Sequence, residues 1–399
     1  MLESIYIGMS GLTAYSKGLQ TISNNVANMN TPGFKASTPR FADLFYGQQF
    51  APNQPGALNI MSFGSGVEYG YASLNFKQGD IQSSDGQLDL AIRGNGFLTL
   101  LDNGTTRYAR TGQFVVGDDN TIVDKVTGMK LAALDGSGKP AVISIDGKRT
   151  SAPSATTSVQ FTDNLSSSAT SFSVPNVDVY DANGGKHTLT IDFKPDNANF
   201  PGRWSVSVTE KDSSVPVQQG TLQFLGGIPE AGMDSIDVTL RPTGGSPFTF
   251  KLDFSSGVTS FSSGSTSTLR VGKTDGSAPG DLSTLSVDDS GALVIGYSNG
   301  KSATLGTVAL ANFIDPQSLQ QIGNGLFDAS RAAPPSYVAS KGPGVGELLS
   351  GSTESSNVDL SVEFGRLILI QRGFQASSQV VTTANEMIMQ LFQMRGGQG

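Results

Sequence analysis

The sequence predicts a mainly β protein with α-helical termini, in which the middle of the chain forms two antiparallel β domains, the second inserted in the first. Three observations favour this fold class. Apolar residues recur at heptad spacing at both ends of the chain, and short alternating runs separated by Gly, Asp and Asn fill the middle. Two Ser/Thr-rich stretches, 146–175 and 255–280, bracket the predicted insertion. With 399 residues, the chain is also too long for one compact core.

The first helix is expected within residues 1–30. Most of its apolar residues follow the spacing of three or four that forms one heptad seam. The run Thr31-Pro32-Gly33 then gives a strong helix stop and turn signal. The predicted seam consists of Leu2, Ile5, Met9, Leu12, Leu19, Ile22 and Val26.

The second helix is expected within residues 358–399. Residues 355–357 supply candidate N-caps, and a glycine pair at 396–397 closes the helix. Its predicted seam consists of Leu360, Leu367, Ile370, Phe374, Val381, Ala384, Ile388 and Leu391, and it is widened by Val380, Met387 and Met394.

Both predicted helices are unusually poor in charge. The first carries only Glu3 and Lys17, whereas a solvated helix face is normally rich in Glu and Lys. Gly8, Gly11 and Gly18 each cost about 1 kcal/mol relative to Ala in a helix interior, so such a helix is marginal alone. The two helices either belong to one bundle within a monomer or form when packed on neighbouring molecules. Their wide, uncharged faces favour the second interpretation.

The composition argues against catalytic, cofactor and metal chemistry. The chain has no cysteine, and its only histidine, His187, lies at the start of a predicted strand and is interpreted as a surface or sheet-edge residue. The only tryptophan, Trp204, lies in an alternating strand pattern and is expected in the core. A net charge of −8 disfavours nucleic-acid binding, and no run of about 20 apolar residues predicts membrane insertion. We therefore expect no enzyme activity, no catalytic residues, no cofactor and no metal site.

Four stretches of the chain resemble the bacterial flagellar rod and hook proteins, the flagellar axial protein family. The C-terminal stretch is the most specific of the four. The matching motifs are SNNVAN at 23–28 with NTPGFK at 30–35, DLAIRGNGF at 89–97, RYARTGQF at 107–114, and LLSGSTESSNVDLS at 348–361 with QRGFQASS at 371–378.

Within this family, the length of the chain and its large inserted β domain favour a hook-type subunit over the shorter rod proteins. The resemblance implies that the terminal helices pair as a coiled coil, order on assembly and line the channel of a helical tube. It also implies that this flexible, curved tube is a universal joint that transmits torque from rod to filament.

The resemblance implies an extracellular location in the flagellar hook of the basal body. The N-terminus lacks the basic and apolar regions of a cleaved signal peptide, which fits export through the flagellar type III apparatus. The implied partners are the chain itself as a helical homopolymer, the flagellar rod, the hook cap, the hook–filament junction proteins and the export apparatus. Neither nucleic acid nor direct membrane insertion is expected.

The expected domain organisation follows from the same comparison and from shifts in composition. Residues 1–30 and 358–399 form a helical coiled-coil core, and 31–71 with 336–357 form an extended connecting segment with few strands. The first β domain then covers 72–145 and 286–335, and the inserted outer β domain covers 146–285.

The expected assembly residues lie in the family motifs and on the apolar positions of the two terminal helices. They are Leu12, Leu19, Ile22, Asn24, Asn25, Val26, Asn28, Thr31, Gly33, Phe34, Asn357, Phe364, Gln371, Arg372, Phe374, Val381, Met387 and Leu391.

Two alternatives remain open at this point. Within the family, the chain could be a distal rod or hook–filament junction axial protein. From a different class, it could be a secreted β-rich adhesin or a polymer-acting enzyme. An enzyme of that kind needs a carboxylate pair in a cleft, which no pattern here nominates, and an adhesin should lack uncharged helical ends.

Overall fold

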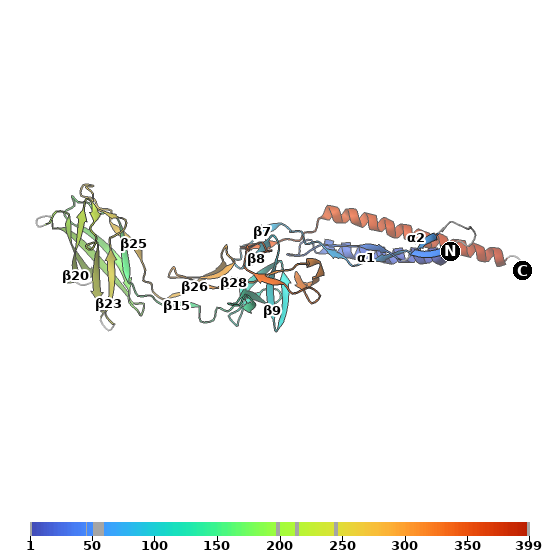
Figure 1. Cartoon of the computed structure of the whole chain (residues 1–399), viewed down its shortest axis with the longest axis horizontal. Coiled ribbons are helices and arrows are strands. Elements are labelled where there is room, and N and C mark those ends of the chain that lie inside the picture. Colours follow the sequence, from blue (N-terminus) through green and yellow to red (C-terminus); the bar gives the residue numbers. More distant parts are fainter. Residues whose placement is uncertain are drawn as a thin grey trace. The chain divides into compact units, whose positions relative to one another are not determined.

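The computed structural model describes residues 2–44, 46–50, 60–196, 200–211, 215–242 and 246–396. Part of the predicted connecting segment (51–59) and the end of the predicted second helix (397–399, with its closing Gly397) lie outside the described residues. Figure 1 labels the main elements. The chain separates into two compact units, unit 1 (Met1–Asp146, Leu285–Val294 and Thr304–Gly399) and unit 2 (Gly147–Thr284 and Ile295–Ala303).

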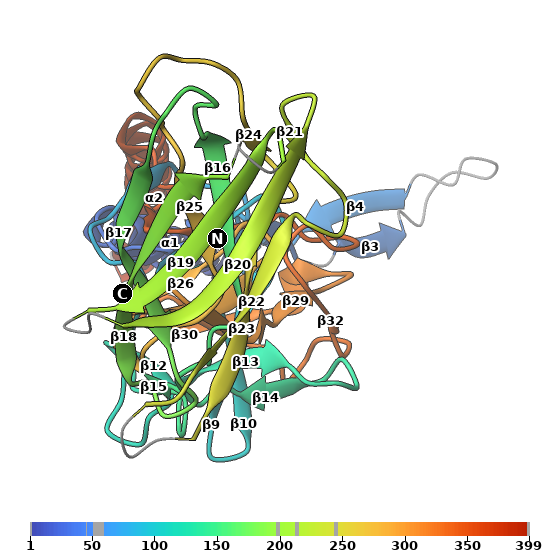
Figure 2. The ribbon, with the colours of Figure 1, turned by 90° about the vertical axis from the view of Figure 1, so that its left-hand side faces the viewer.

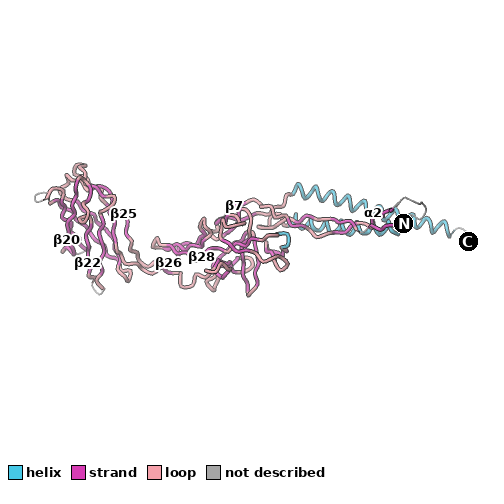
Figure 3. Tube along the Cα trace, viewed as in Figure 1, coloured by secondary structure: helices cyan, strands magenta, loops and turns pink. Residues whose placement is uncertain are grey.

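The two ends of the chain form the long helices of unit 1. Helix α1 (Leu2–Ala27) packs along helix α2 (Leu360–Gly396), and Figure 3 shows these helices at the termini of an otherwise strand-rich chain. The predicted fold class, mainly β with paired terminal helices, is confirmed.

The predicted seam of α1 is wrong over its first turns. Leu2 is 79% exposed and Met9 is 55% exposed. A row of glycines lets two helix backbones approach closely, so small residues are buried at the contact and the larger apolar side chains are left at its margins. The buried residues of α1 are Gly8, Gly11, Ala14, Gly18, Ile22 and Asn25.

The segment after α1 contains more strands than the sequence predicted. Several short strands pair in twos, and one of the ribbons lies along α1, where the Thr21 hydroxyl is 2.6 Å from the Tyr69 hydroxyl. Short ribbons escaped prediction because strands of two to five residues carry too few alternating positions to stand out in the sequence. The pairs are β1 (Ser37–Thr38) with β6 (Ser73–Leu74), β2 (Phe41–Asp43) with β5 (Val67–Tyr69), and β3 (Tyr46–Phe50) with β4 (Ile60–Gly64).

The β part of unit 1 is built from antiparallel pairs around an aromatic cluster. The Phe97 ring lies 5.8 Å from Phe76, 5.7 Å from Phe313 and 5.6 Å from Phe327. Its elements are β7 (Ile81–Ser83), β8 (Asp89–Arg93), β9 (Phe97–Asp102), β10 (Thr105–Ala109), β11 (Thr111–Val116), β12 (Ile122–Asp124), β13 (Lys130–Leu134), β14 (Pro140–Val142), β29 (Leu310–Asn312), the 3-10 turn η1 (Pro316–Ser318), β30 (Gln320–Gly323), β31 (Leu326–Asp328), β32 (Ser336–Val338), β33 (Glu347–Ser350) and β34 (Ser352–Glu354). The division between the units falls within β26 (Gly280–Val287), β27 (Ala292–Tyr297) and β28 (Ser302–Val308).

Unit 2 is a sandwich of two five-stranded sheets, parts of which Figure 2 shows face on. Alternating apolar residues of both sheets meet in one core, where the Phe254 ring stacks on Phe161 at 4.6 Å and meets Phe193 at 5.9 Å. Trp204 is buried in this core, as predicted. One sheet is β17 (Phe172–Tyr180), β18 (Lys186–Pro195), β19 (Arg203–Glu210), β20 (Pro216–Leu225) and β21 (Ile228–Pro229). The other is β22 (Ser235–Leu240), β23 (Phe248–Asp253), β16 (Ser158–Asn164), β24 (Val258–Thr259) and β25 (Arg270–Thr274), and β15 (Thr150–Ser151) pairs with β26.

The interpretation of His187 as a surface or sheet-edge residue is wrong. It lies in β18, which pairs with β17 on one side and β19 on the other, and its side chain is only 14% exposed. Within β18, His187 pairs with Val179 of β17, and the ladder with β19 begins at Leu189. A single alternating pattern does not show which strand of a sheet is internal.

Two strand pairs join the segment before α2 to the β part of unit 1. Strand β33 pairs with β8, and β34 pairs with β7, so the chain that leads into α2 returns beside the β part. This return brings the segment after α1 and the segment before α2 together.

Candidate assembly surfaces and the junction that holds them

The α1–α2 contact is close because glycines line it. A Cβ added at Gly11 would lie 2.5 Å from Ser377 Oγ, and one at Gly8 would lie 2.6 Å from Val381 Cγ2. On α2, a Cβ added at Gly373 would lie 2.6 Å from the Tyr15 ring. The glycines that look costly in an isolated helix therefore permit this approach.

The face of α2 that meets α1 repeats every seven residues. Ile370 and Ala384 are buried there, as the predicted seam requires, and Glu363 is buried at the same heptad position. Leu367, Val381 and Ile388 of the predicted seam are half-buried, whereas Phe374 and Leu391 are exposed.

A second apolar face of α2 is largely exposed in the described chain. Leu369 is 70% exposed and Met394 is 75% exposed. The members recur at spacings of three, four, seven and eleven, so they follow one helix face distinct from the buried one. We call this face the outer stripe, and it consists of Val362, Leu369, Val380, Met387, Leu391 and Met394.

Asn25 fastens α1 to α2 and to the chain that follows. This fully buried side chain donates through Nδ2 to the Ser37 carbonyl at 2.7 Å and to Glu363 Oε2 at 3.1 Å, and its Oδ1 accepts from the Ser37 N–H at 2.9 Å. Arg366 in turn donates to Glu363 Oε1 at 2.8 Å. A buried carboxylate with these donors is satisfied, which is the condition for burying it at all.

Glu354 is the centre of a buried charged cluster with Lys35 and Arg110 in unit 1, which we call the junction. Its Oε1 accepts from Lys35 Nζ at 2.5 Å and from the Gly79 N–H at 2.9 Å, and its Oε2 accepts from Arg110 Nε at 3.1 Å. The Glu354 and Lys35 side chains are fully buried, and that of Arg110 is 5% exposed. The cluster thus places two cations against one carboxylate inside the protein.

Arg110 and Asn357 extend this junction into the neighbouring backbone. Arg110 also donates to the carbonyls of Gly96, Ile92 and Gly94. Asn357 Oδ1 accepts from the Ala36 N–H at 2.8 Å, and its Nδ2 donates to the Lys77 carbonyl at 2.8 Å. All four sequence motifs that resemble the axial family therefore meet in one hydrogen-bonded network.

The charge balance shows in the titration of Lys35. Burial lowers the pKa of Lys35 below 10.5, the Glu354 carboxylate opposes that change, and the Arg110 charge adds to it. The junction therefore holds two buried positive charges, and the Glu354 carboxylate offsets the free-energy cost of burying them.

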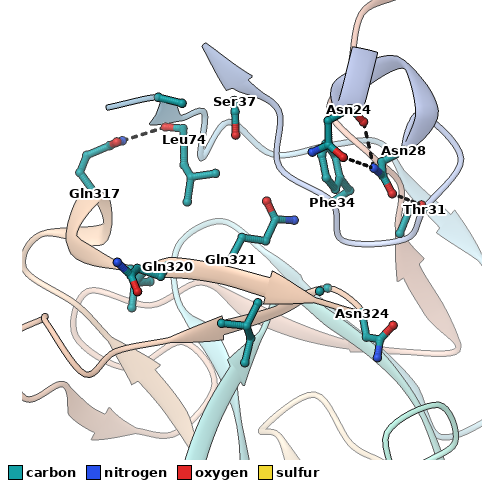
Figure 4. Close-up of a pocket in the computed structure, with 15 residues that line it drawn as sticks. Asn24, Asn28, Thr31, Phe34, Ser37, Leu74, Gln317, Gln320, Gln321 and Asn324 are labelled. Atoms are coloured by element: carbon teal, nitrogen blue, oxygen red, sulfur yellow. Dashed lines mark hydrogen bonds between the residues drawn. The ribbon is translucent and has the colours of Figure 1, made fainter. Parts of the chain in front are cut away.

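A cleft opens beside the junction, between the end of α1 and the edge strand β30 (Figure 4). Its volume is about 640 Å³, and six of its fifteen lining residues carry carboxamide side chains. Asn28 donates to the Asn24 Oδ1 at 3.1 Å, and Thr31 donates to the Asn28 Oδ1 at 3.1 Å. Gln317 donates to the Leu74 carbonyl at 2.9 Å on the opposite wall. The lining also includes Phe34, Ser37, Gln320, Gln321 and Asn324.

The predicted assembly residues fall into three groups by burial. Ile22, Asn25, Gly33 and Phe34 are buried inside the chain. Leu12, Leu19, Val26, Asn28, Thr31, Asn357 and Val381 are half-buried. Asn24, Phe364, Gln371, Arg372, Phe374, Met387 and Leu391 are exposed.

Sequence reasoning missed the charged centre of the junction and the glycines of the helix contact. Lys35, Arg110 and Glu354 lie inside the quoted motifs, so the few charged residues of these motifs were the available signal. The glycines were counted only as a cost to helix formation. Their regular placement along one face of α1 was the signal for a close helix contact.

The described residues offer little for chemistry. No group of three or more His, Asp or Glu side chains in them could hold a metal ion. Neither helix, over the residues that are described, is long and apolar enough to cross a membrane.

The sequence matches three family profiles. Residues 5–35 match "Flagella basal body rod protein", 144–276 match "Flagellar basal body protein FlaE D2 domain", and 349–394 match "Flagellar basal body rod FlgEFG protein C-terminal". The flagellar hook protein FlgE of Salmonella typhimurium is 32% identical over 97% of this chain and 98% of its own. The Escherichia coli flagellar hook protein FlgE is 30% identical with the same coverage, and that of Borreliella burgdorferi is 28% identical over 99% of this chain and 100% of its own. A solved structure of the Helicobacter pylori flagellar hook protein FlgE2 aligns with a TM-score of 0.45 at 12% identity, and covers 69% of this chain and 99% of that one.

Paired terminal helices with an uncovered apolar stripe, joined to β-rich units, define a structural subunit of a flagellar axial assembly. The near full-length similarity is more specific: the chain belongs to the flagellar hook protein family. It is a structural subunit of the bacterial flagellar hook, and this family is not an enzyme family.

Proposed function

We propose that the chain polymerises into the hook tube by burying the outer stripe of α2 against the helices of a second copy. The exposure of this stripe is the observation that carries the proposal, because apolar faces of this length are normally covered. A contact between the outer stripe of one copy and a different surface of the next is heterologous, and such a contact builds an open helical filament. This polymer is the hook: a flexible, curved tube that acts as a universal joint and transmits torque from the rod to the flagellar filament.

We propose distinct roles for the parts of the chain in this tube. Residues 1–30 and 358–399 form the inner core, 31–71 and 336–357 connect it to the first β domain at 72–145 and 286–335, and 146–285 form the outer domain. The separate core of unit 2 supports this division, because a domain with its own core can shift without disturbing the inner helices.

The predicted assembly residues then act in two ways. Exposed residues such as Phe364, Arg372 and Met387 contact neighbouring copies. Buried residues such as Asn25 and Phe34 hold the helices in the geometry that presents those contacts. The carboxamide cleft of Figure 4 has hydrogen-bonding groups and a free strand edge at β30, and we assign it to a contact with an extended segment of a neighbouring copy.

Export and partner choice follow from the same proposal. We propose that the chain leaves the cell through the flagellar type III apparatus and lies outside the cell between rod and filament. Its further partners are then the rod, the hook cap and the hook–filament junction proteins. Family membership supports these assignments, and no catalytic step is needed for any of them.

The outer stripe can be tested by a double substitution, Met387→Ser with Leu391→Ser. Each removes an exposed apolar side chain whose burial contributes about 1.5–3 kcal/mol, so the concentration needed for polymerisation should rise at least about 100-fold. Electron microscopy of negatively stained, salt-polymerised protein measures tube formation.

Val126→Ser is the matched control, because Val126 is an apolar residue of unit 1 that is 68% exposed and lies outside the helices. This variant should form tubes as the unchanged chain does. If the Met387/Leu391 double variant forms normal tubes, the outer stripe is not part of the assembly surface and the proposal is wrong.

A further inference from the structure

His187 lies between two carboxylates in unit 2. Its Nδ1 is 3.0 Å from Glu210 Oε1, and its Nε2 is 3.5 Å from Asp181 Oδ2. The side chain is 14% exposed, and Nε2 is buried without a hydrogen-bond partner. The ring also lies 5.7 Å from the Phe248 ring, so little water reaches it.

Neither neutral form of the imidazole satisfies this site. If the proton is on Nδ1, the Nε2 lone pair faces Asp181; if it is on Nε2, the Nδ1 lone pair faces Glu210. Only the imidazolium, with a proton on each nitrogen, can donate towards both carboxylates. The geometry therefore favours the doubly protonated ring.

Other charges on the surrounding elements do not replace this arrangement. Strand β17 contributes Asp178, whose Oδ2 is 2.7 Å from Lys186 Nζ of β18. Lys211 follows β19, and its N–H donates to the Thr188 carbonyl at 2.8 Å. The remaining charges on the packed elements are Lys194, Asp192, Arg203, Lys251 and Asp253, and none of them forms a described contact with His187.

Asp181 belongs to a tight turn of unit 2 that packs against Pro153 and Pro279. Its Oδ1 accepts from the N–H groups of Asn183 and Gly185, each at 2.8 Å. Gly184 has φ +86°, and a Cβ added there would lie 2.6 Å from Pro279 Cδ and 3.0 Å from Pro153 Cβ. Pro153 and Pro279 lie in two irregular segments of unit 2, beside the isolated bridge in which Ser154 and Ser277 exchange backbone hydrogen bonds of 3.0 and 2.9 Å.

We propose that His187 is a pH-sensitive clamp that ties this turn, and through it the two segments that hold Pro153 and Pro279, to β19. The protonated ring bridges Asp181 of the turn and Glu210 of β19. When the pH rises and the ring loses a proton, a lone pair faces one carboxylate and the clamp opens. This device goes beyond the assembly function proposed above, because it lies wholly within unit 2 and uses none of the helix residues.

The first test uses the fact that the chain has one histidine. The full-length protein, labelled in its imidazole carbons and nitrogens, gives one set of histidine ring signals in nuclear magnetic resonance. We expect the signals of the doubly protonated ring at pH 7. Signals of a neutral ring at that pH would overturn the proposal, whatever the variants below do.

The second test measures the stability of unit 2 in the full chain against pH. Trp204 is the only tryptophan and lies in the core of unit 2, so its fluorescence reports the unfolding of this unit alone. If the two carboxylates hold the doubly protonated ring as proposed, the stability that this contact contributes is present at low pH and is lost as the pH rises and the clamp opens. One proton changes the unfolding equilibrium by at most about tenfold per pH unit.

Three variants separate the clamp from general effects. His187→Gln and Asp181→Asn should both flatten this pH dependence, and the Asn side chain can still accept the two turn N–H groups. Asp178→Asn, which removes a carboxylate that pairs with Lys186 instead, should leave it unchanged. Parallel pH curves for the unchanged chain and His187→Gln would overturn the proposal.

Discussion

At the scale of single residues, charge balance decides which side chains of the junction can be replaced. Glu354 faces both Lys35 and Arg110, and all three are nearly or fully buried. Glu354→Gln keeps the shape but leaves two buried cations without their carboxylate, so we expect unit 1 to lose about 3–5 kcal/mol. Urea unfolding followed by circular dichroism measures this, with Trp204 fluorescence as the internal reference for unit 2.

Lys35→Met is the matched control and should cost only about 1 kcal/mol. The Lys77 carbonyl still accepts from Asn357, and Glu354 still accepts from Gly79 and Arg110. Because burial lowers the pKa of Lys35, the unfolded chain binds this proton more tightly, and the Lys35 contribution makes unit 1 more stable as pH rises towards 10.5. An equal loss from both substitutions would contradict the charge-balance argument.

Asn25 gives a second residue-scale prediction. Asn25→Asp places a second carboxylate opposite Glu363 and removes the donor that joins them at 3.1 Å, so we expect a loss of about 2–4 kcal/mol at neutral pH. The neighbouring Asn24→Asp should be nearly neutral, because Asn24 is exposed and its Oδ1 only accepts, from Asn28. Hydrogen exchange of the Ser37 amide measures whether the contact between Asn25 and Ser37 is kept. Equal protection of this amide in both variants would contradict the predicted role of Asn25.

The same residues show what a sequence can reveal at this scale. Asn25, Phe34 and Asn357 were singled out, but their contacts were not, because Lys35 and Glu354 meet across 319 positions of the chain. Pairing over such a separation is set by how β33 and β34 return to the sheet. A motif identifies the side chains, and only the fold identifies which carboxylate neutralises which cation.

At the scale of elements, the two helices differ in how well their patterns predicted their contacts. In α2 the heptad positions of Ile370 and Ala384 are buried, because large apolar residues mark that face. In α1 the contact face carries Gly8, Gly11 and Gly18, which hydropathy does not distinguish from solvent positions. The pattern therefore predicted that the helices exist and pair, but it predicted the packed face in only one of them.

Two glycines of α2 test the close contact. A Cβ at Gly373 would meet the Tyr15 ring at 2.6 Å, and that ring is itself packed 5.3 Å from Phe41. Gly373→Ala should therefore weaken helix pairing and raise the critical concentration for polymerisation. Gly365 has open space around it, so Gly365→Ala should gain about 1 kcal/mol of helix propensity and lower that concentration about fivefold. Sedimentation of polymer from monomer measures both, and a shift in the same direction would refute close glycine packing.

At the scale of the whole molecule, the chain combines regions with different cores. The aromatic cluster around Phe97 and the Glu354 junction are built from unit 1 residues, and the cluster around Trp204 is built from unit 2 residues. Alternating patterns predicted that the middle of the chain is β-rich. They could not predict the short ribbons that follow α1, because strands of two to five residues are too short to show an alternating pattern.

The separate cores predict that unit 2 can be removed without loss of unit 1. Ser154 and Ser277 form an antiparallel bridge, so a short glycine-containing turn can replace residues 155–276 between them. None of the removed residues belongs to the Phe97 cluster, the Glu354 junction or the outer stripe, so the stability of unit 1 should change by no more than about 0.5 kcal/mol. Circular dichroism measures that stability, and electron microscopy should still show tubes. If the shortened chain folds but forms no tubes, unit 2 takes part in assembly and the helices alone do not drive it; if it fails to fold, the two cores depend on each other.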